Sequence, residues 1–239
     1  MKPVAIFRHV PTEGPAYFAT YLAGRGIPWR LVKIDEGEPV PPDARDFSGL
    51  CLMGGPMSVN DDLPWIPKVV ELIQGAVDAE VPVVGHCLGG QLMAKALGGE
   101  VTRHRVKEIG WGRVDVIENA EAERWFGAGF RSFSAFHWHG ETFSIPPRAL
   151  RIASSPYCEN QAFALGKHLG LQCHVEMTPE LIRTWCLDWQ KEVQSLAARM
   201  PSVQTPAEMT DALDAKVQHL NAVADRVYER WIAGLERKG

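Results

Sequence analysis

Short apolar runs alternate with amphipathic stretches through the first hundred residues of the chain. Apolar or alternating runs predict strands at residues 4–7, 29–34, 49–53 and 81–84. Apolar positions at helical spacing predict helices over residues 16–25, 65–79 and 88–97. Strands that alternate with helices favour a parallel sheet covered by helices on both faces.

The pattern changes after Gly99. Short β-type runs predict further strands, and a sheet that becomes mixed, at residues 113–117, 133–136, 150–153, 162–165 and 169–173. Thr178 and Pro179 begin a helix whose apolar stripe reaches Leu196. A capping box over residues 205–208 begins a long amphipathic helix that extends to Trp231.

These patterns divide the chain in two. We expect one α/β domain over residues 1–190 and a C-terminal helical extension over residues 191–239. The extension is expected to pack on the core or on a partner, and the last roughly 40 residues are expected to contribute nothing to the active site. If its apolar stripe over residues 209–231 were exposed, it would favour a homodimer.

Composition narrows the class of protein. The hydrophobic content of 46% and the charged content of 23% are ordinary for a globular protein. A formal charge of −4 without a Lys/Arg cluster argues against a nucleic-acid partner. No apolar run is long enough to span a membrane, and a strand begins so early that we expect no signal peptide. Five cysteines without paired metal-type spacing indicate a reducing compartment, for which we expect the cytoplasm.

Cys87 lies at the corner between the predicted strand 81–84 and the helix 88–97. A sharp strand-to-helix turn exposes its corner residue and strains its backbone, and glycines on either side let other backbone approach it. The helix N-terminus favours a thiolate over a thiol there, and its free N–H groups could hold an oxyanion. The alternative is a small buried thiol at an ordinary strand–helix junction.

Two further signals complement this cysteine. His174 and Glu176 are two residues apart at a predicted strand end, so they share a face at the sheet edge where Cys87 also lies. Together the three supply a nucleophile, a base and a group that orients the base. The N–H groups of Gly55, just past the strand 49–53, and of Leu88 would form an oxyanion hole. Taken singly, these signals also fit a surface His and Glu and a plain Gly-Gly-Pro turn.

Three ordered motifs together resemble the class I (triad) glutamine amidotransferase family over roughly residues 1–189. They are Gly54-Gly-Pro56, Gly85-His-Cys-Leu-Gly-Gly-Gln91 and His174-Val-Glu176. The resemblance implies a flavodoxin-like three-layer α/β/α fold with a mixed, mostly parallel central sheet, here followed by C-terminal helices. It also implies hydrolysis of the glutamine side-chain amide to glutamate and ammonia through a γ-glutamyl thioester, without a cofactor. The implied roles are nucleophile for Cys87, base and acid for His174, orienter for Glu176, oxyanion donors for Gly55 and Leu88, and substrate holder for Gln91.

The segment Phe136-His-Trp-His-Gly-Glu-Thr-Phe143 resembles the family's loop that contacts the amino-acid end of glutamine. This resemblance makes His137, Trp138, His139 and Gly140 candidate substrate-binding residues, although a Trp is more often a packing residue. His137 and His139 could also ligate a metal. No third and fourth ligand at useful spacing is evident in the sequence, so no metal is expected.

Two positions depart from the family's pattern and leave the acyl substrate open. His86 replaces a small apolar residue beside the nucleophile, and Gly90 stands where His or Met is common. The leading hypothesis is a stand-alone amidotransferase-type hydrolase, similar to the glutaminase domain of GMP synthase, that works alone or supplies ammonia to a synthetase subunit. One alternative is a γ-glutamyl peptidase or hydrolase acting on other γ-glutamyl amides. An alternative of another class is a non-catalytic binding or thiol redox-sensing protein on the same fold.

Overall fold

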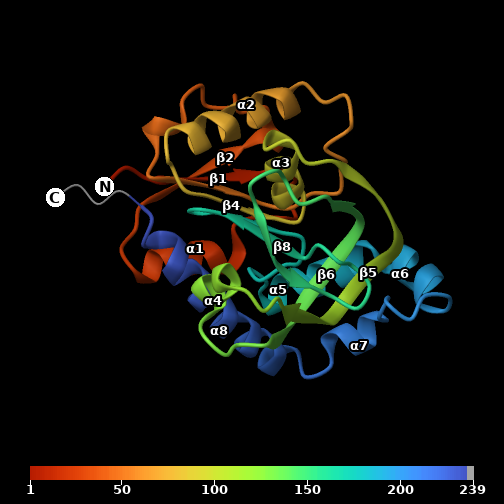
Figure 1. The fold of residues 1–239 in the computed structure, drawn as a ribbon. Coiled ribbons are helices and arrows are strands. Elements are labelled where there is room, and N and C mark those ends of the chain that lie inside the picture. Colours follow the sequence, from red (N-terminus) through yellow and green to blue (C-terminus); the bar gives the residue numbers. More distant parts are fainter. Residues whose placement is uncertain (236–239) are drawn as a thin grey trace.

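One mixed sheet forms the centre of the computed structural model, which describes residues 1–235 (Figure 1). Within these residues the strand order is β2-β1-β3-β4-β9-β8-β7-β5-β6. The strands are β1 (Val4–Arg8), β2 (Trp29–Lys33), β3 (Gly49–Leu52), β4 (Val83–His86), β5 (Val101–Val116), β6 (Ser132–Phe143), β7 (Leu150–Ser154), β8 (Ala162–Leu165) and β9 (His168–Leu171). The helices are α1 (Ala16–Gly24), α2 (Trp65–Asp78), α3 (Leu88–Ala96), α4 (Ala120–Phe126), α5 (Pro179–Asp188), α6 (Gln190–Ala197), α7 (Pro206–Thr210) and α8 (Leu213–Ile232).

The two faces of the sheet bury alternate side chains of the same strands. Val4 and Ile6 of β1 belong to the apolar cluster that includes α1 and α8. Ala5 and Phe7 belong to the cluster that includes α2 and α3 on the opposite face. Successive side chains of a strand point to opposite faces, so β1 must be covered on both sides. Figure 1 shows these two helical layers. The predicted flavodoxin-like three-layer α/β/α class is confirmed.

Parallel and antiparallel pairings divide the sheet into halves. β1 pairs in parallel with β2 and β3, and β4 pairs in parallel with β3 and β9. The pairings from β9 through β8, β7 and β5 to β6 are antiparallel. Because parallel strands end at the same edge, the segments that follow β3, β4 and β9 meet there. This edge carries the three motifs singled out in the sequence.

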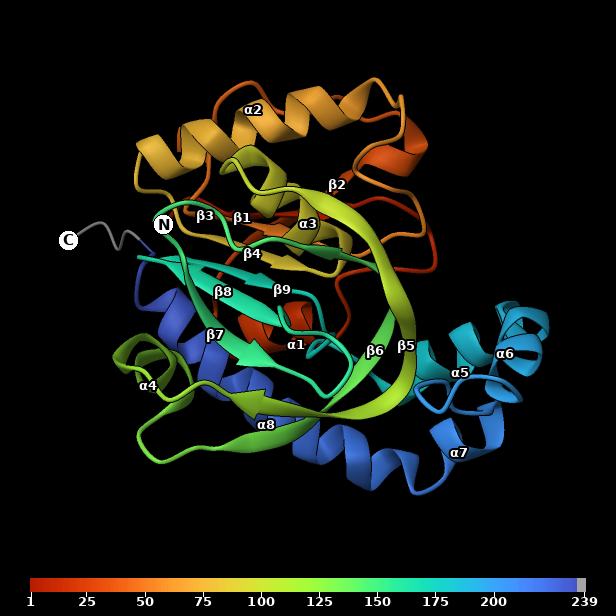
Figure 2. The same cartoon turned by 45° about the vertical axis from the view of Figure 1, so that its right-hand side comes forward.

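The strands predicted at residues 113–117 and 133–136 are parts of the much longer β5 and β6. These two strands form a long curved ribbon that extends away from the parallel half of the sheet (Figure 2). The apolar pattern did not reveal the added length because residues 102–107 of β5 are exposed or half-buried and mostly polar. The pairing with β6 shifts register within this segment, between Arg103 and Glu108.

The helical part of the chain is more broken than its apolar periodicity predicts. The stripe that begins at Thr178 is divided between α5 and α6, and the stripe that begins at Thr205 is divided between α7 and α8. Ala212 adopts a positive φ of 47° at the second break. An apolar stripe can continue across such a break, so periodicity does not show it. The short α4 was not predicted, although Asn119 caps it by accepting from the Ala122 N–H.

The apolar stripe of α8 is buried within the chain. Its buried side chains include Val217, Leu220, Tyr228 and Trp231, and they belong to the same cluster as β1 and α1. The stripe is therefore not exposed, and it offers no surface for the homodimer that its exposure would have favoured. Across residues 1–235, no helix has both the length and the apolar character needed to cross a membrane.

Candidate active site

Cys87 sits between the end of β4 and the start of α3 with φ 51° and ψ −107°. This conformation is rare and strained for a residue with a Cβ. The surroundings hold it in place: the Cys87 N–H donates to the Leu171 carbonyl at 2.8 Å, and α3 packs closely on β3 and β9. A Cβ on Gly90 would overlap the Leu171 carbonyl oxygen, so this close approach requires glycine.

His174 and Glu176 lie beyond the end of β9, and both are buried. The His174 N–H donates to the Phe136 carbonyl at 2.9 Å, which fixes this segment against β6. The His174 Nδ1 lies 2.6 Å from the Glu176 Oε1. Because a carboxylate only accepts, Nδ1 carries the proton, and Nε2 is left available to a reacting group. Within residues 1–235, Nε2 makes no hydrogen bond.

The charges of the site support each other. Burial alone would lower the pKa of His174, but Glu176 and then Cys87 outweigh it and raise that pKa well above its ordinary value. Burial would raise the pKa of Glu176, but His86 and His174 together hold it at about 2. The Glu176 carboxylate thus favours the charged form of the His174 ring. A ring in this environment can carry a proton at the cavity that Cys87 also lines.

The contacts of His86 account for one of the two departures noted in the sequence. It is fully buried, its Nε2 lies 2.9 Å from the Tyr228 hydroxyl of α8, and the same atom lies 3.9 Å from the Glu176 Oε2. Burial lowers the pKa of His86, and the charge of Glu176 opposes this effect. The ring therefore links Glu176 to the C-terminal helix from behind the triad, and it does not line the cavity at Cys87.

The proposed oxyanion donors flank the nucleophile. Leu88 is the first residue of α3, and the N–H groups of a first helical turn have no partner inside the helix. Gly55 lies so close that a Cβ on it would approach the Leu88 side chain to 2.8 Å. The pair is adjacent, and its role as an oxyanion hole stays a prediction.

A cavity of about 560 Å³ opens beside Cys87. Its lining includes His174, the predicted oxyanion donor Gly55, and four of the five predicted substrate-binding residues, namely Gln91, Trp138, His139 and Gly140. The carbonyl oxygen of Trp138 lies 3.8 Å from the Cys87 Sγ. His137 is not among the described residues that line this cavity, because its ring is buried beside Glu108. The structure therefore places His137 away from this cavity, and its predicted role in substrate binding stays a prediction.

Two residues of the site were not singled out in the sequence. Gln172 donates to the Cys87 Sγ at 3.7 Å and accepts from the Gln91 Nε2 at 3.1 Å. Gln172 could have been predicted from its position between Leu171 and His174, because the residues just past the strand ends of this sheet form the candidate site. Glu13 lines the cavity from the loop after β1, and only the fold brings that loop near His174.

The C-terminal segment contributes to the cavity. Glu192, Leu196 and Met200 line it together with Trp185 and Trp189 of the preceding helix region. From the sequence, the last roughly 40 residues are expected to stay out of the active site; of those that the structure describes, Met200, at their start, lines the cavity. These residues recur at helical spacing across α5 and α6, so one side of this region lines the cavity.

The arrangement of these residues agrees with a comparison to known proteins. The family model for class I glutamine amidotransferases matches residues 17–189. This chain belongs to that family. The crystal structure of a glutamine amidotransferase from Methylobacillus flagellatus has a TM-score of 0.96 and 46% sequence identity, and the match covers 100% of this chain and 97% of that one.

Curated family members show the range of related proteins. The glutamine amidotransferase-like protein YfeJ of Salmonella typhimurium is 28% identical over 84% of this chain and 86% of its own length. Gamma-glutamyl peptidase 4 of Arabidopsis thaliana is 27% identical over 69% of this chain and 68% of that protein. A GMP synthase of Pseudomonas aeruginosa is 34% identical over 54% of this chain, a match that spans only 25% of the synthase.

Proposed function

We propose that this protein hydrolyses the side-chain amide of glutamine to glutamate and ammonia, with Cys87 as the nucleophile. The observation that supports the proposal best is the His174–Glu176 pair at 2.6 Å, with Cys87 and His174 lining one cavity. Family membership supports the same reaction class, because these are generally cysteine-nucleophile enzymes.

The proposed chemistry has two steps. The Cys87 thiolate attacks the amide carbon, and the resulting oxyanion accepts hydrogen bonds from the N–H groups of Gly55 and Leu88. The tetrahedral intermediate then collapses, the C–N bond breaks, and His174 gives its proton to the departing ammonia. Water attacks the γ-glutamyl thioester in the second step, His174 takes its proton, and the C–S bond breaks to release glutamate.

Glu176 and Gln91 have supporting roles in this proposal. Glu176 keeps the proton of His174 on Nδ1, so that Nε2 serves the reacting atoms. Gln91 lines the cavity and holds Gln172, whose amide reaches the Cys87 sulfur. We propose that this amide pair positions the substrate against the nucleophile.

The test is to incubate the purified protein with glutamine and to measure ammonia, glutamate and the acylated cysteine by mass spectrometry. We expect Cys87→Ala to lower the rate by at least about a thousandfold, because removing a nucleophile of such a set costs about as much as removing the whole set. Cys186→Ala, which removes a buried thiol outside the site, is expected to keep the activity. Activity that persists in Cys87→Ala contradicts the proposal. Rapid oxidation of Cys87 by peroxide, without acylation by any amide, would support a redox sensor instead.

A second candidate function is hydrolysis of larger γ-glutamyl amides, as the name of the Arabidopsis relative suggests. The cavity volume of about 560 Å³ lies within the range of sites for molecules larger than one amino acid. Arg103 and Arg105 line it from β5 and would attract the carboxylate of a peptide leaving group. For this candidate, a γ-glutamyl dipeptide should have a higher kcat/KM than glutamine, and Arg105→Ala should remove the difference. Arg113→Ala, an exposed change on the same strand but outside the cavity, serves as the control.

An ammonia-accepting synthetase subunit stays a prediction as well. The GMP synthase relative carries its matching region within a longer protein, whereas the YfeJ match extends over most of a protein of similar length. We propose that ammonia from this site reaches an acceptor only if a synthetase binds at the cavity mouth. Stimulation of the glutaminase rate by a copurifying synthetase would be the expected sign.

A further inference from the structure

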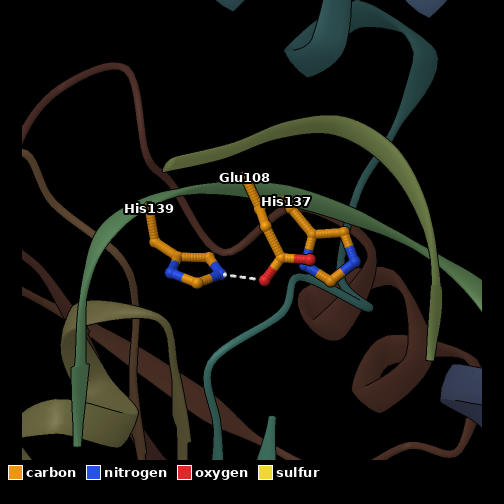
Figure 3. A group of neighbouring side chains, drawn as sticks. All are labelled: Glu108, His137 and His139. Atoms are coloured by element: carbon orange, nitrogen blue, oxygen red, sulfur yellow. Dashed lines mark hydrogen bonds and ion pairs between the residues drawn. The ribbon is translucent and has the colours of Figure 1, made fainter. Parts of the chain in front are cut away.

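Three side chains with metal-ligand chemistry meet on one face of the β5–β6 ribbon. The register of the two antiparallel strands sets Glu108 directly opposite His139. His137 lies two residues before His139 and so shares its face. Gly110 is the cross-strand partner of His137 and leaves that position without a side chain. The ligand atoms of Glu108, His137 and His139 lie within 4.8 Å of one another (Figure 3).

His137 has an unusual environment for a buried polar side chain. It is only 1% exposed, and neither ring nitrogen has a hydrogen-bond partner within residues 1–235. Leaving a buried polar group without a partner costs roughly 1–3 kcal/mol, so native structures rarely do it. The sequence nevertheless keeps room for this ring, because a Cβ on Gly112 would lie 2.9 Å from the His137 Cδ2. An unpartnered imidazole directed toward a carboxylate and a second imidazole is typical of a metal ligand.

His139 gives a second, independent indication of a positive charge at this point. Its Nδ1 lies 3.0 Å from the Glu141 carbonyl oxygen, and its Nε2 lies 3.1 Å from the Glu108 Oε2. Both neighbours are hydrogen-bond acceptors, but a neutral imidazole donates from only one of its nitrogens. The arrangement is satisfied when Nδ1 donates to the carbonyl and a cation lies between Nε2 and the carboxylate.

We propose that Glu108, His137 and His139 bind a divalent cation of the zinc type. Two imidazole nitrogens and one carboxylate oxygen are a known ligand set for Zn²⁺, and they leave a fourth position for water. The carboxylate is already oriented for this task, because Ser155 donates to its Oε1 and Gln161 donates to its Oε2, each at 2.8 Å. Such outer-shell hydrogen bonds are a regular feature of metal sites.

The consequence of the cation is structural and concerns the cavity wall. His139, Gly140 and Glu141 line the cavity, and the carbonyl of the intervening Trp138 lies 3.8 Å from the Cys87 Sγ. A metal that joins β5 to β6 at this point would fix the position of that wall. The cation does not take part in the proposed acyl transfer, so this inference extends beyond the proposed function.

The experiment measures Zn²⁺ binding in Cys87→Ser, which removes the thiolate as a competing zinc ligand and makes the result independent of glutaminase activity. We expect one equivalent of Zn²⁺ by calorimetry and by elemental analysis after gel filtration. His137→Gln and Glu108→Gln should each weaken binding by more than about tenfold, because even outer-shell changes cost about 10- to 100-fold. His168→Gln, which changes an equally buried histidine on β9, should leave binding unchanged.

Three results would overturn the proposal: no Zn²⁺ binding in Cys87→Ser, equal binding in His137→Gln, or equal binding in Glu108→Gln. Circular dichroism checks that the variants are folded. If they are not, crystals of Cys87→Ser soaked in Zn²⁺ decide the question. An anomalous peak bonded to both imidazoles and to Glu108 supports the site, and its absence there overturns the proposal.

Discussion

Glu13 lies in the cavity wall beside Gly54 and close to His174. Burial raises the pKa of this carboxyl group from its ordinary 4.5 to about 7, and the effect of His174 in lowering it is smaller. At the lower end of the neutral range the folded chain therefore keeps a proton on Glu13 that the unfolded chain has lost. This difference links the free energy of unfolding to pH.

We predict that Glu13→Gln reduces the loss of stability that accompanies rising pH. Between 4.5 and about 7 the native state binds more protons than the unfolded state, so the free energy of unfolding falls as pH rises. The difference in the free energy of unfolding between the wild type and Glu13→Gln should change by up to about 3 kcal/mol from about pH 5 to about pH 8. Denaturant titrations at both pH values measure it. Glu71→Gln on the exposed face of α2 is the control, and equal pH dependence of Glu13→Gln and wild type would contradict the prediction.

Candidate site residues that lie within a recognisable motif could be predicted from the sequence. Candidate residues that become neighbours only through the pairing of separate strands could not. Cys87, His174 and Glu176 were predicted because each lies just past the end of a predicted strand, and parallel strands end at the same sheet edge. His137 and His139 were recognised as a possible ligand pair, but Glu108 was not added to them. That third ligand depends on the register of β5 against β6, and a single strand's pattern does not determine register.

At the scale of elements, the close packing of α3 on the sheet positions Cys87. Gly89 and Gly90 face backbone of β3 and β9, and a Cβ on either would overlap the carbonyl oxygen of Leu52 or Leu171. The glycine at position 90 therefore has a packing reason. A larger side chain there would push the helix, and Cys87 with it, away from the sheet edge.

We predict that Gly90→Ala destabilises the fold by about 2 kcal/mol or more and lowers activity, because the added methyl group forces α3 outward. Gly75→Ala is a matched control in α2, where a Cβ meets nothing within 4 Å. That change should stabilise the protein by about 0.5–1 kcal/mol, through higher helix propensity and lower entropy of the unfolded chain. Thermal unfolding of the two variants measures both changes in stability. If Gly90→Ala changed the stability no more than Gly75→Ala does, α3 would have room to adjust.

The order and type of most elements followed from periodicity and capping residues, whereas breaks and polar strands did not. The strands at residues 4–7 and 49–53 could be predicted because each is a continuous apolar run, which is typical of a buried strand. The capping box at Thr205 correctly marked the start of α7. The bend at Ala212 was invisible because Met209 and Leu213 continue the apolar stripe on both sides of it. Its positive φ is a tertiary effect, imposed where α8 packs on the core.

For the whole molecule, α8 closes one face of the sheet and so belongs to the same cooperative unit as β1. Trp231 is fully buried and packs edge-on against Phe18 of α1, with ring centroids 5.5 Å apart. Tyr228 packs against the same ring and bonds to His86 behind the triad. The C-terminal helix therefore supports both the core and the carboxylate of the site.

We predict that Trp231→Ala lowers the free energy of unfolding by about 3–5 kcal/mol, the usual cost of removing a large buried aromatic ring. Leu187→Ala, at a position that is 74% exposed on α5, should cost about 0.5 kcal/mol or less. Equilibrium unfolding followed by circular dichroism gives both values. A small effect of Trp231→Ala would mean that α8 can separate from the sheet without loss of the fold.

The strained corner at Cys87 has a consequence for protein engineering. A φ of 51° with a ψ of −107° costs of order 1–3 kcal/mol for any residue that carries a Cβ, and glycine escapes most of that cost. A laboratory selection that rewarded heat resistance alone would therefore favour replacing the cysteine by glycine. Stability and the proposed reactivity compete at this one position. Mutant libraries made to raise the heat resistance of this protein should therefore leave residue 87 unvaried.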